Sequence, residues 1–209
     1  MPQPDPLSIF FDHLEGVGRY EGRLPHWRQP GKIYFVTWRL ADSLAAAQLD
    51  EIKRARALYS NAPERKANVL MTPAEQRRHK RLFSERVQRW LDAGAGACEL
   101  NDLRARSIVR DALKHFHGQR YALGSFALAG NHVHVLVIPS SGFELSSILH
   151  SWKSFTAHAI NKALNRTGTL WRDEYYDHLV RDETALQAIE NYILAHANKG
   201  AYVEERKLL

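Results

Sequence analysis

The sequence predicts a mixed α/β fold, because it holds three strand-like segments, several longer helix-like segments and enough apolar residues for one core. The strand-like segments are rich in β-branched and aromatic residues and cover residues 32–40, 121–130 and 131–139. The 209 residues are 44% hydrophobic, so the chain can bury one good core. We therefore expect a single domain over residues 1–209 with a helical elaboration.

The elements are expected in a definite order along the chain. Residues 1–31 form an irregular lead-in, rich in Pro, Gly and aromatic residues, that ends in the turn-prone QPGK before the first strand. Helices are expected at about 43–60, 72–91, 101–117, 143–164 and 183–199. Cap residues support two of these helices, because Thr72 suits an N-terminus and Gly200 suits a C-terminus.

The charge of the chain favours a polyanionic partner. The formal net charge is +6 and the isoelectric point is near 9.5. The excess is concentrated in residues 51–120, which hold 16 Lys and Arg against 8 Asp and Glu. Cys98 stands alone, which excludes an intramolecular disulfide and fits a reducing compartment. With neither a signal peptide nor an apolar run of about 20 residues, we expect a cytoplasmic, nucleoid-associated protein without a membrane anchor.

Two histidines stand out in the segment NHVHVLVIP at residues 131–139. In a strand, successive side chains alternate between faces, so His132 and His134 share one face. Their backbones then lie roughly 6–7 Å apart, and both imidazoles can converge on one ion. The alternative is a pair of hydrogen-bonded or half-exposed histidines without a ligand. A metal site requires a third ligand from elsewhere in the chain.

The last predicted helix offers such a ligand. Ile189, Tyr192, Ile193 and His196 follow the spacing i, i+3, i+4, i+7, by which a helix packs onto a sheet. Tyr192 and His196 therefore lie one turn apart on the face that meets the protein. The alternative is a core tyrosine beside a buried, hydrogen-bonded histidine.

Taken together, these segments resemble a known family. In order, they are the strand with His132-x-His134 after Asn131, a helix with WKSFTA, the stretch LWRDEYYDHLVR, and a helix with Tyr-x-x-x-His followed by KG. This order resembles the REP-associated tyrosine transposases, which belong to the single-tyrosine branch of the HUH nucleases. Residues 24–44 also look like the opening strand of that family. The resemblance extends from about residue 24 to residue 203.

The resemblance implies a fold, a site and a reaction. The fold is ferredoxin-like, with an antiparallel sheet, packed helices and both histidines on an inner strand. Carried over, the ligands of a divalent ion, Mg²⁺ or Mn²⁺, are His132, His134 and His196, and the nucleophile is Tyr192. The implied substrate is single-stranded or hairpin DNA, such as repetitive extragenic palindromes, cleaved through a 5′-phosphotyrosine with release of a 3′-hydroxyl.

The chain departs from the family pattern in two places. Where the family is expected to have Asn-Pro, this chain has His196-Ala197. Histidine is a competent ligand, so the change either preserves activity and shifts preference from Mg²⁺ towards Mn²⁺ or other ions, or marks a site that is losing its activity. The stretch at about 43–118 also looks longer and more basic than compact members need, and we expect it to be a helical insertion.

Candidate DNA contacts fall into two groups. The basic cluster at residues 77–81, followed by Arg86 and Arg89, can contact phosphates, although a solvated helix face is the alternative. Lys153 and the aromatic residues of 171–178 can contact phosphates and bases, or form a surface salt bridge and pack within the protein. The individual candidates are Arg77, Arg78, Lys80, Arg81, Lys153, Trp171, Arg172 and Tyr176. Tyr176 is also the second candidate nucleophile, but it lacks a histidine four residues later.

The sequence therefore predicts a metal-dependent single-strand DNA endonuclease and strand transferase. One alternative is a domesticated hairpin-binding protein with an impaired site, which would bind DNA without cutting it. Another is a small-substrate metallohydrolase that uses His132 and His134 and has no need of Tyr192. The oligomeric state stays open.

Overall fold

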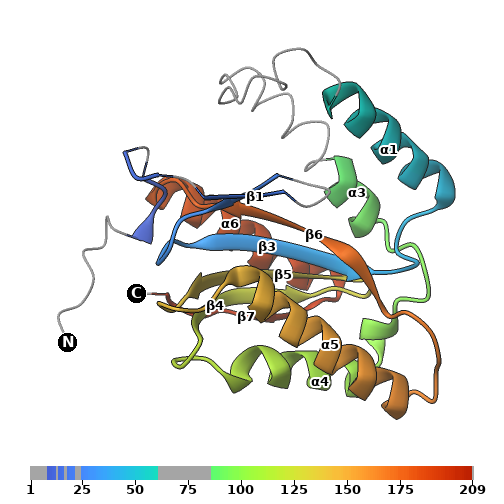
Figure 1. Cartoon of the computed structure of the whole chain (residues 1–209). Helices are drawn as coiled ribbons and strands as arrows, with labels where there is room; N and C mark the ends of the chain where they lie inside the picture. The colour runs from blue at the N-terminus through green and yellow to red at the C-terminus, as the bar shows by residue number, and fades with distance from the viewer. Residues whose placement is uncertain (1–8, 13, 17, 22–24, 61–85, 209) are drawn as a thin grey trace. The chain divides into compact units, whose positions relative to one another are not determined.

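The structure is a computed structural model that describes residues 9–12, 14–16, 18–21, 25–60 and 86–208 (Figure 1). Contacts divide the chain into two compact units. Unit 1 comprises Met1–Ala41 and Glu99–Leu209, and unit 2 comprises Asp42–Cys98. The expectation of a single domain over residues 1–209 stays a prediction.

Unit 1 contains a five-stranded sheet with the strand order β6-β3-β5-β4-β7. Every neighbouring pair is antiparallel, and the histidine strand β5 lies in the centre. The predicted α/β fold class, with an antiparallel sheet and the histidines on an inner strand, is confirmed. The strands are β3 (Tyr34–Leu40), β4 (Tyr121–Leu128), β5 (His132–Pro139), β6 (Trp171–Leu179) and β7 (Tyr202–Glu204).

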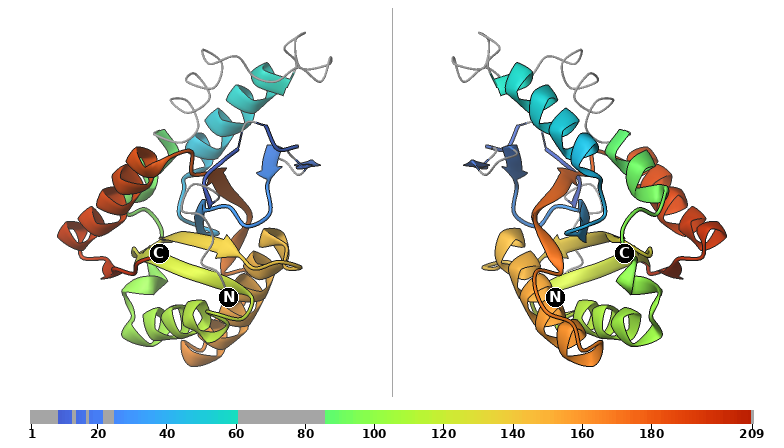
Figure 2. Two further views of the ribbon diagram at one scale, coloured as in Figure 1. Left: turned by 90° about the vertical axis from the view of Figure 1, so that its left-hand side faces the viewer. Right: turned by 90° about the vertical axis from the view of Figure 1, so that its right-hand side faces the viewer.

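Helices cover both faces of this sheet (Figures 1 and 2). Helices α4 (Leu103–His115) and α5 (Leu145–Ala163) pack on one face, and α6 (Glu183–Ala195) packs on the other. Because it is central and covered on both sides, β5 is buried almost along its whole length. Its two histidines are therefore buried, not half-exposed.

The face under α4 and α5 holds the larger core cluster, which centres on aromatic residues. Trp38 stacks on Trp152 with ring centroids 5.8 Å apart. The indole Nε1 of Trp152 donates a hydrogen bond to the hydroxyl of Tyr121 at 2.9 Å, and that hydroxyl donates to the carbonyl of Leu113 at 2.9 Å. The polar ends of Trp152 and Tyr121 are thus paired, which allows these two rings to be buried with their donors satisfied.

Helix α4 falls within the stretch at about 43–118 that was expected to be an insertion, and it packs in unit 1. Its buried residues Ala105, Val109, Ala112 and Leu113 follow a helical stripe that faces the core of unit 1. Residues 99–118 therefore belong to unit 1, and the helical insertion stays a prediction.

Unit 2 contains α1 (Ala46–Ser60) and α3 (Arg86–Asp92), joined by an ion pair between Arg86 and Glu51. The helix expected at about 43–60 is confirmed as α1. Of the helix expected at about 72–91, residues 86–91 lie in α3, and the remainder, with its cap Thr72, lies outside the described residues. Gly96 has a φ of 92°, and a Cβ there would lie 2.9 Å from the backbone of Asp42, so only glycine fits.

The lead-in is more regular than expected, because β1 (Gly18–Glu21) and β2 (Pro25–Arg28) pair as an antiparallel hairpin. Arg28 connects this hairpin to β6. Its guanidinium donates to Asp177 Oδ2 at 2.6 Å and to the hydroxyl of Tyr175 at 2.9 Å. Such short strands carry little periodic signal, and a tertiary ion pair holds this hairpin in place.

The remaining helical turns are η4 (Glu99–Asn101) and η5 (His196–Lys199). Gly200 ends η5 with a φ of 78°, which confirms the predicted cap. In the described part of the chain, no helix combines the length and the apolar character that a membrane span requires.

Two positions on α5 test this packing. Leu149 is 1% exposed in the core, whereas Phe155 is 60% exposed. Leu149→Ala should lower the free energy of unfolding by about 2–5 kcal/mol, because it leaves a cavity. Phe155→Ala should change it by less than about 0.5 kcal/mol. Urea denaturation followed by circular dichroism measures both, and equal losses would contradict the assigned faces of α5.

Candidate metal and tyrosine site

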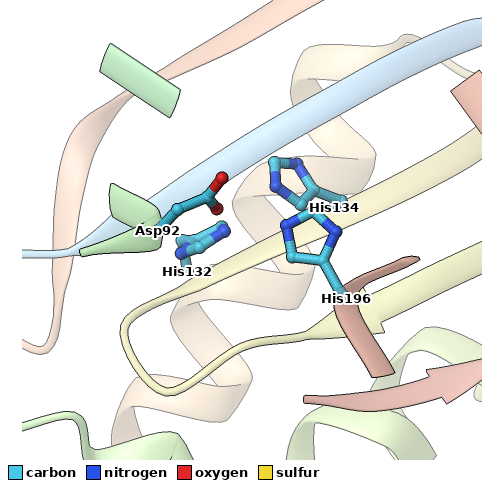
Figure 3. A group of neighbouring side chains, drawn as sticks. All are labelled: Asp92, His132, His134 and His196. Carbon is cyan, nitrogen blue, oxygen red and sulfur yellow. The ribbon is translucent and has the colours of Figure 1, made fainter. Parts of the chain in front are cut away.

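Three buried histidines from two elements meet in unit 1 (Figure 3). His132 and His134 lie on β5, and His196 lies at the end of α6, where η5 begins. Their exposed fractions are 1%, 0% and 1%. One ring nitrogen from each lies within 4.8 Å of those of the other two. We call these residues the three-histidine cluster. Asp92, also drawn in Figure 3, belongs to unit 2 and is not counted among its ligands.

The register between β3 and β5 orients His134. Thr37 on β3 lies directly opposite His134, so both side chains point to the same face of the sheet. The hydroxyl of Thr37 lies 2.7 Å from Nδ1 of His134, and both groups are buried. This contact fixes the plane of the ring and directs Nε2 away from β3.

His132 is oriented by the residue that precedes it. Asn131, 1% exposed, ends the turn between β4 and β5. Its Oδ1 lies 2.7 Å from Nδ1 of His132. An amide oxygen only accepts hydrogen bonds, so Nδ1 of His132 is the donor.

His196 is oriented by the end of its own helix. The last carbonyls of a helix have no partner within the ladder. Here the backbone N–H of His196 bonds to Ile193 and Leu194, and the imidazole Nδ1 instead reaches the carbonyl of Tyr192 at 2.8 Å. A carbonyl oxygen only accepts, so Nδ1 of His196 carries the proton.

These contacts leave the cluster suited to a metal ion. In His132 and His196 the proton lies on Nδ1, so the neutral imidazole has its lone pair on Nε2. Donation from Nδ1 to the oxygen of Thr37 gives His134 the same arrangement. Metal-binding histidines are commonly held by an oxygen acceptor on the second nitrogen. The donor chemistry therefore fits a divalent ion held by three imidazoles.

Tyr192 completes the site. Its hydroxyl lies 3.3 Å from Nε2 of His134, beside the ligand atoms. Its ring packs edge-on against His196 at 4.7 Å and against Phe35 at 6.2 Å between centroids. The residue is half-buried. Helix α6 thus positions one candidate ligand and one candidate nucleophile on adjacent turns, as the i, i+4 spacing predicts.

Burial keeps His134 neutral. It lowers the pKa of the imidazole well below its ordinary value of 6.5. The charge of Lys199, and that of His132 and His196 when they are protonated, lowers this pKa further. At neutral pH the ring therefore has a lone pair, which can accept a hydrogen bond or hold an ion.

Tyr176, the second candidate nucleophile, lies on the same face of the sheet as the cluster. It stands opposite Thr37 on the edge strand β6, with Thr37 between it and His134. Its ring lies 5.7 Å from that of His178. Phe35 stacks on His134 at 5.4 Å and contacts His178 edge-on at 5.4 Å. Tyr176 is half-buried and separated from the cluster by one strand, so Tyr192 is the better placed phenol.

The predicted DNA contacts have different outcomes. Trp171 is 4% exposed, its Nε1 donates to Thr156 Oγ1 at 2.9 Å, and its ring packs against Trp38, which favours the packing alternative, while its stacking on bases stays a prediction. Lys153 is half-buried, and its Nζ donates to the carbonyl of Asp173 at 2.6 Å. Burial lowers the pKa of Lys153. Arg172 is also half-buried. Their DNA contacts, with that of Tyr176, stay predictions, and Arg77, Arg78, Lys80 and Arg81 lie outside the described residues.

Two residues that orient the histidines were not predicted. Asn131 belongs to the sequence motif, and an amide beside a buried histidine is a usable signal for its contact with His132. Thr37 lies 97 residues from His134. Its one local signal is a hydroxyl in the otherwise apolar and aromatic stretch YFVTW.

Comparison with known proteins identifies the segment that carries the site. A family model described as "Transposase IS200 like" matches residues 99–196. Residues 99–196 are therefore similar to IS200-like transposases. The resemblance to single-tyrosine transposases is thereby confirmed at the level of this family. The IS200-like segment contains all three histidines of the cluster and Tyr192.

A solved structure described as "Structure of the REP associates tyrosine transposase bound to a REP hairpin" is also similar to this chain. The TM-score is 0.46 and the sequence identity is 13%. The similarity covers 86% of this chain and 74% of that chain. No curated protein matches the chain.

The contact with Thr37 can be tested in the IS200-like site by ion binding. Thr37→Val removes the oxygen beside His134 Nδ1 and keeps the side-chain shape, so the affinity for Mn²⁺ should fall about 10- to 100-fold. Thr37→Ser keeps the hydroxyl and should bind as the parent does. Isothermal titration calorimetry measures the affinities. Equal binding by the valine variant would show that Thr37 does not orient His134.

The lowered pKa of His134 predicts how stability depends on pH in chelator-treated protein. Near pH 6.5 the unfolded chain takes up a proton at this position, whereas the folded protein does not. The free energy of unfolding should therefore fall as the pH drops below about 6.5, by at most about 1.4 kcal/mol per pH unit from this group. His134→Gln should remove this part of the slope, and the matched change of an exposed histidine, His150→Gln, should leave it. Urea denaturation at a series of pH values measures the slope, and an unchanged slope in His134→Gln would contradict the assignment.

Proposed function

We propose that this protein is a metal-dependent single-strand DNA endonuclease and strand transferase, with Tyr192 as nucleophile. The observation that carries the proposal is the hydroxyl of Tyr192 beside Nε2 of His134, within a three-histidine cluster of an IS200-like segment. The similarity of residues 99–196 to IS200-like transposases supports the class of reaction. The geometry supports the choice of residues.

The proposed reaction cleaves one phosphodiester bond. The oxygen of Tyr192 loses its proton as it attacks phosphorus, and the bond from phosphorus to the 3′ oxygen breaks. The 3′ oxygen leaves and takes up a proton, which gives a free 3′-hydroxyl and a 5′-phosphotyrosine. A divalent ion, when bound by the three histidines, supplies electrostatic stabilisation of the charge that develops on the phosphate.

The chain's own residues prepare the phenol for this step. The neutral imidazole of His134 accepts a hydrogen bond from Tyr192 in the metal-free protein, which holds the oxygen beside the ligand atoms. The edge-on contacts with His196 and Phe35 restrict rotation of the ring. Holding a nucleophile in a reactive geometry removes part of the entropic barrier to attack.

A tyrosine nucleophile explains strand transfer as well as cleavage. The phosphotyrosine retains the energy of the broken phosphodiester. A 3′-hydroxyl can therefore displace Tyr192 in the reverse reaction and join strands without ATP. A water nucleophile would discard that energy, as in an ordinary hydrolase.

The proposed substrate is single-stranded DNA beside a hairpin, of the kind found in repetitive extragenic palindromes. The residue pattern that resembles the REP-associated transposases supports this choice, and so does the basic excess in residues 51–120. Because phosphate contacts release counterions, affinity for such DNA should fall steeply as the salt concentration rises.

Tyr192→Phe tests the nucleophile. The protein is incubated with labelled single-stranded hairpin oligonucleotides, taken from repeats that flank its own gene, in the presence of Mn²⁺ or Mg²⁺. A denaturing gel should show a protein band that carries the label, and EDTA or Tyr192→Phe should abolish it. Tyr176→Phe is the matched control, because it removes the other candidate phenol from the same face, and it should keep the adduct.

The other outcomes identify the alternatives. Salt-sensitive hairpin binding with neither adduct nor cut strand would favour a domesticated binding protein. Metal-dependent hydrolysis of a small phosphodiester that survives Tyr192→Phe would favour a metallohydrolase. An adduct lost in Tyr176→Phe and kept in Tyr192→Phe would move the nucleophile to β6.

A further inference from the structure

We infer that the three-histidine cluster selects a transition-metal ion such as Mn²⁺, Co²⁺ or Zn²⁺ over Mg²⁺. The inference deepens the proposed function, on which it rests for the use of the ion. The binding preference itself follows from the ligands and can be measured without DNA.

The ligand atoms are the first argument. His132, His134 and His196 each offer a ring nitrogen to the common position. Imidazole nitrogen suits transition ions, whereas Mg²⁺ takes oxygen ligands in near-ideal octahedral geometry. Three nitrogens within 4.8 Å of one another can share a single ion. The same site would give Mg²⁺ three unfavourable ligands.

The oxygens around the cluster are the second argument. The side-chain oxygens of Thr37 and Asn131 and the carbonyl of Tyr192 lie 2.7, 2.7 and 2.8 Å from the Nδ1 atoms. Each is thus engaged in orienting an imidazole. The three oxygens therefore contact the Nδ1 atoms of the imidazoles, and the Nε2 atoms are left to bind the ion. It also organises the ligands before an ion arrives, which raises affinity.

Burial is the third argument. The three imidazoles are at most 1% exposed, and Phe35 stacks on His134. An ion that enters must exchange water for ring nitrogens. Mg²⁺ gives up its water reluctantly and usually retains several water molecules. Replacement of that water by three buried imidazoles therefore disfavours Mg²⁺ further.

The position of His196 makes the preference specific to this chain. It supplies the third nitrogen from the helix that carries Tyr192, four residues beyond it. An asparagine there would offer a carbonyl oxygen and lack the ring nitrogen that reaches the other two ligands. His196→Asn should consequently shift the preference back towards Mg²⁺.

The test measures ion binding by the full chain after removal of metal with a chelator. Mn²⁺, Co²⁺, Zn²⁺ and Mg²⁺ are titrated separately by calorimetry, and Co²⁺ is also followed by its visible absorption. We expect one transition ion per chain to bind at least about tenfold more tightly than Mg²⁺, with Mn²⁺ weaker than Co²⁺. His196→Asn should weaken Co²⁺ binding by at least about tenfold and change the Co²⁺ spectrum. His150→Asn, which changes an exposed histidine on α5, should do neither.

Several results would overturn the inference. These are Mg²⁺ binding as tight as that of Co²⁺, unchanged Co²⁺ binding in His196→Asn, and failure of every ion to bind. Circular dichroism confirms that each variant is folded. The proposed function is tested separately from the ion selectivity. An adduct that forms with Mg²⁺ as readily as with Mn²⁺ would refute the selectivity and leave the role of Tyr192 intact. Selective Co²⁺ binding without any adduct would support the selectivity and contradict the role of Tyr192.

Discussion

The pairing of β3 with β5 in one register is the constraint on which the site depends. It places Thr37 opposite His134 and sends both to the face that α6 covers. Because side chains alternate along a strand, a slip of one residue would turn both histidines of β5 into the core beneath α4 and α5. The apolar residues on the other face of β5, Val133, Val135 and Val137, oppose such a slip, since they pack in the aromatic cluster around Trp38. Packing of the valines on one face of β5 thus fixes the positions of the two histidines on the other face.

Much of this arrangement could be predicted from local patterns. The strand carrying His132-x-His134 and the helix carrying Tyr192 and His196 each have a clear period, and each period specified which side chains share a face. The family resemblance then brought the two segments together. Cap chemistry at Gly200 was also correct, because a left-handed residue after a helical turn favours glycine.

The features that the sequence does not reveal are tertiary contacts. Trp171 is followed in the sequence by charged and aromatic residues, a pattern typical of a surface segment. Its indole nevertheless packs on Trp38 and donates a hydrogen bond to Thr156. The hairpin β1–β2 is held at β6 by Arg28, across 149 residues of sequence. The stretch that contains helix α4 was expected to be an insertion because it is basic. The apolar stripe of α4 packs in the core together with α5, and the sequence alone does not show this contact. In each case the deciding neighbour is distant along the chain, so no window of sequence contains it.

The hydrogen bond from His196 Nδ1 to the carbonyl of Tyr192 has a mechanical consequence. It joins the side chain of a candidate ligand to the backbone of the candidate nucleophile, so the last turn of α6 moves as one body. A displacement that carries the phenol away from the sheet also withdraws a nitrogen from the cluster. Binding of the ion and the position of the nucleophile therefore depend on the same displacement of α6. An effector that shifts α6 would switch both together.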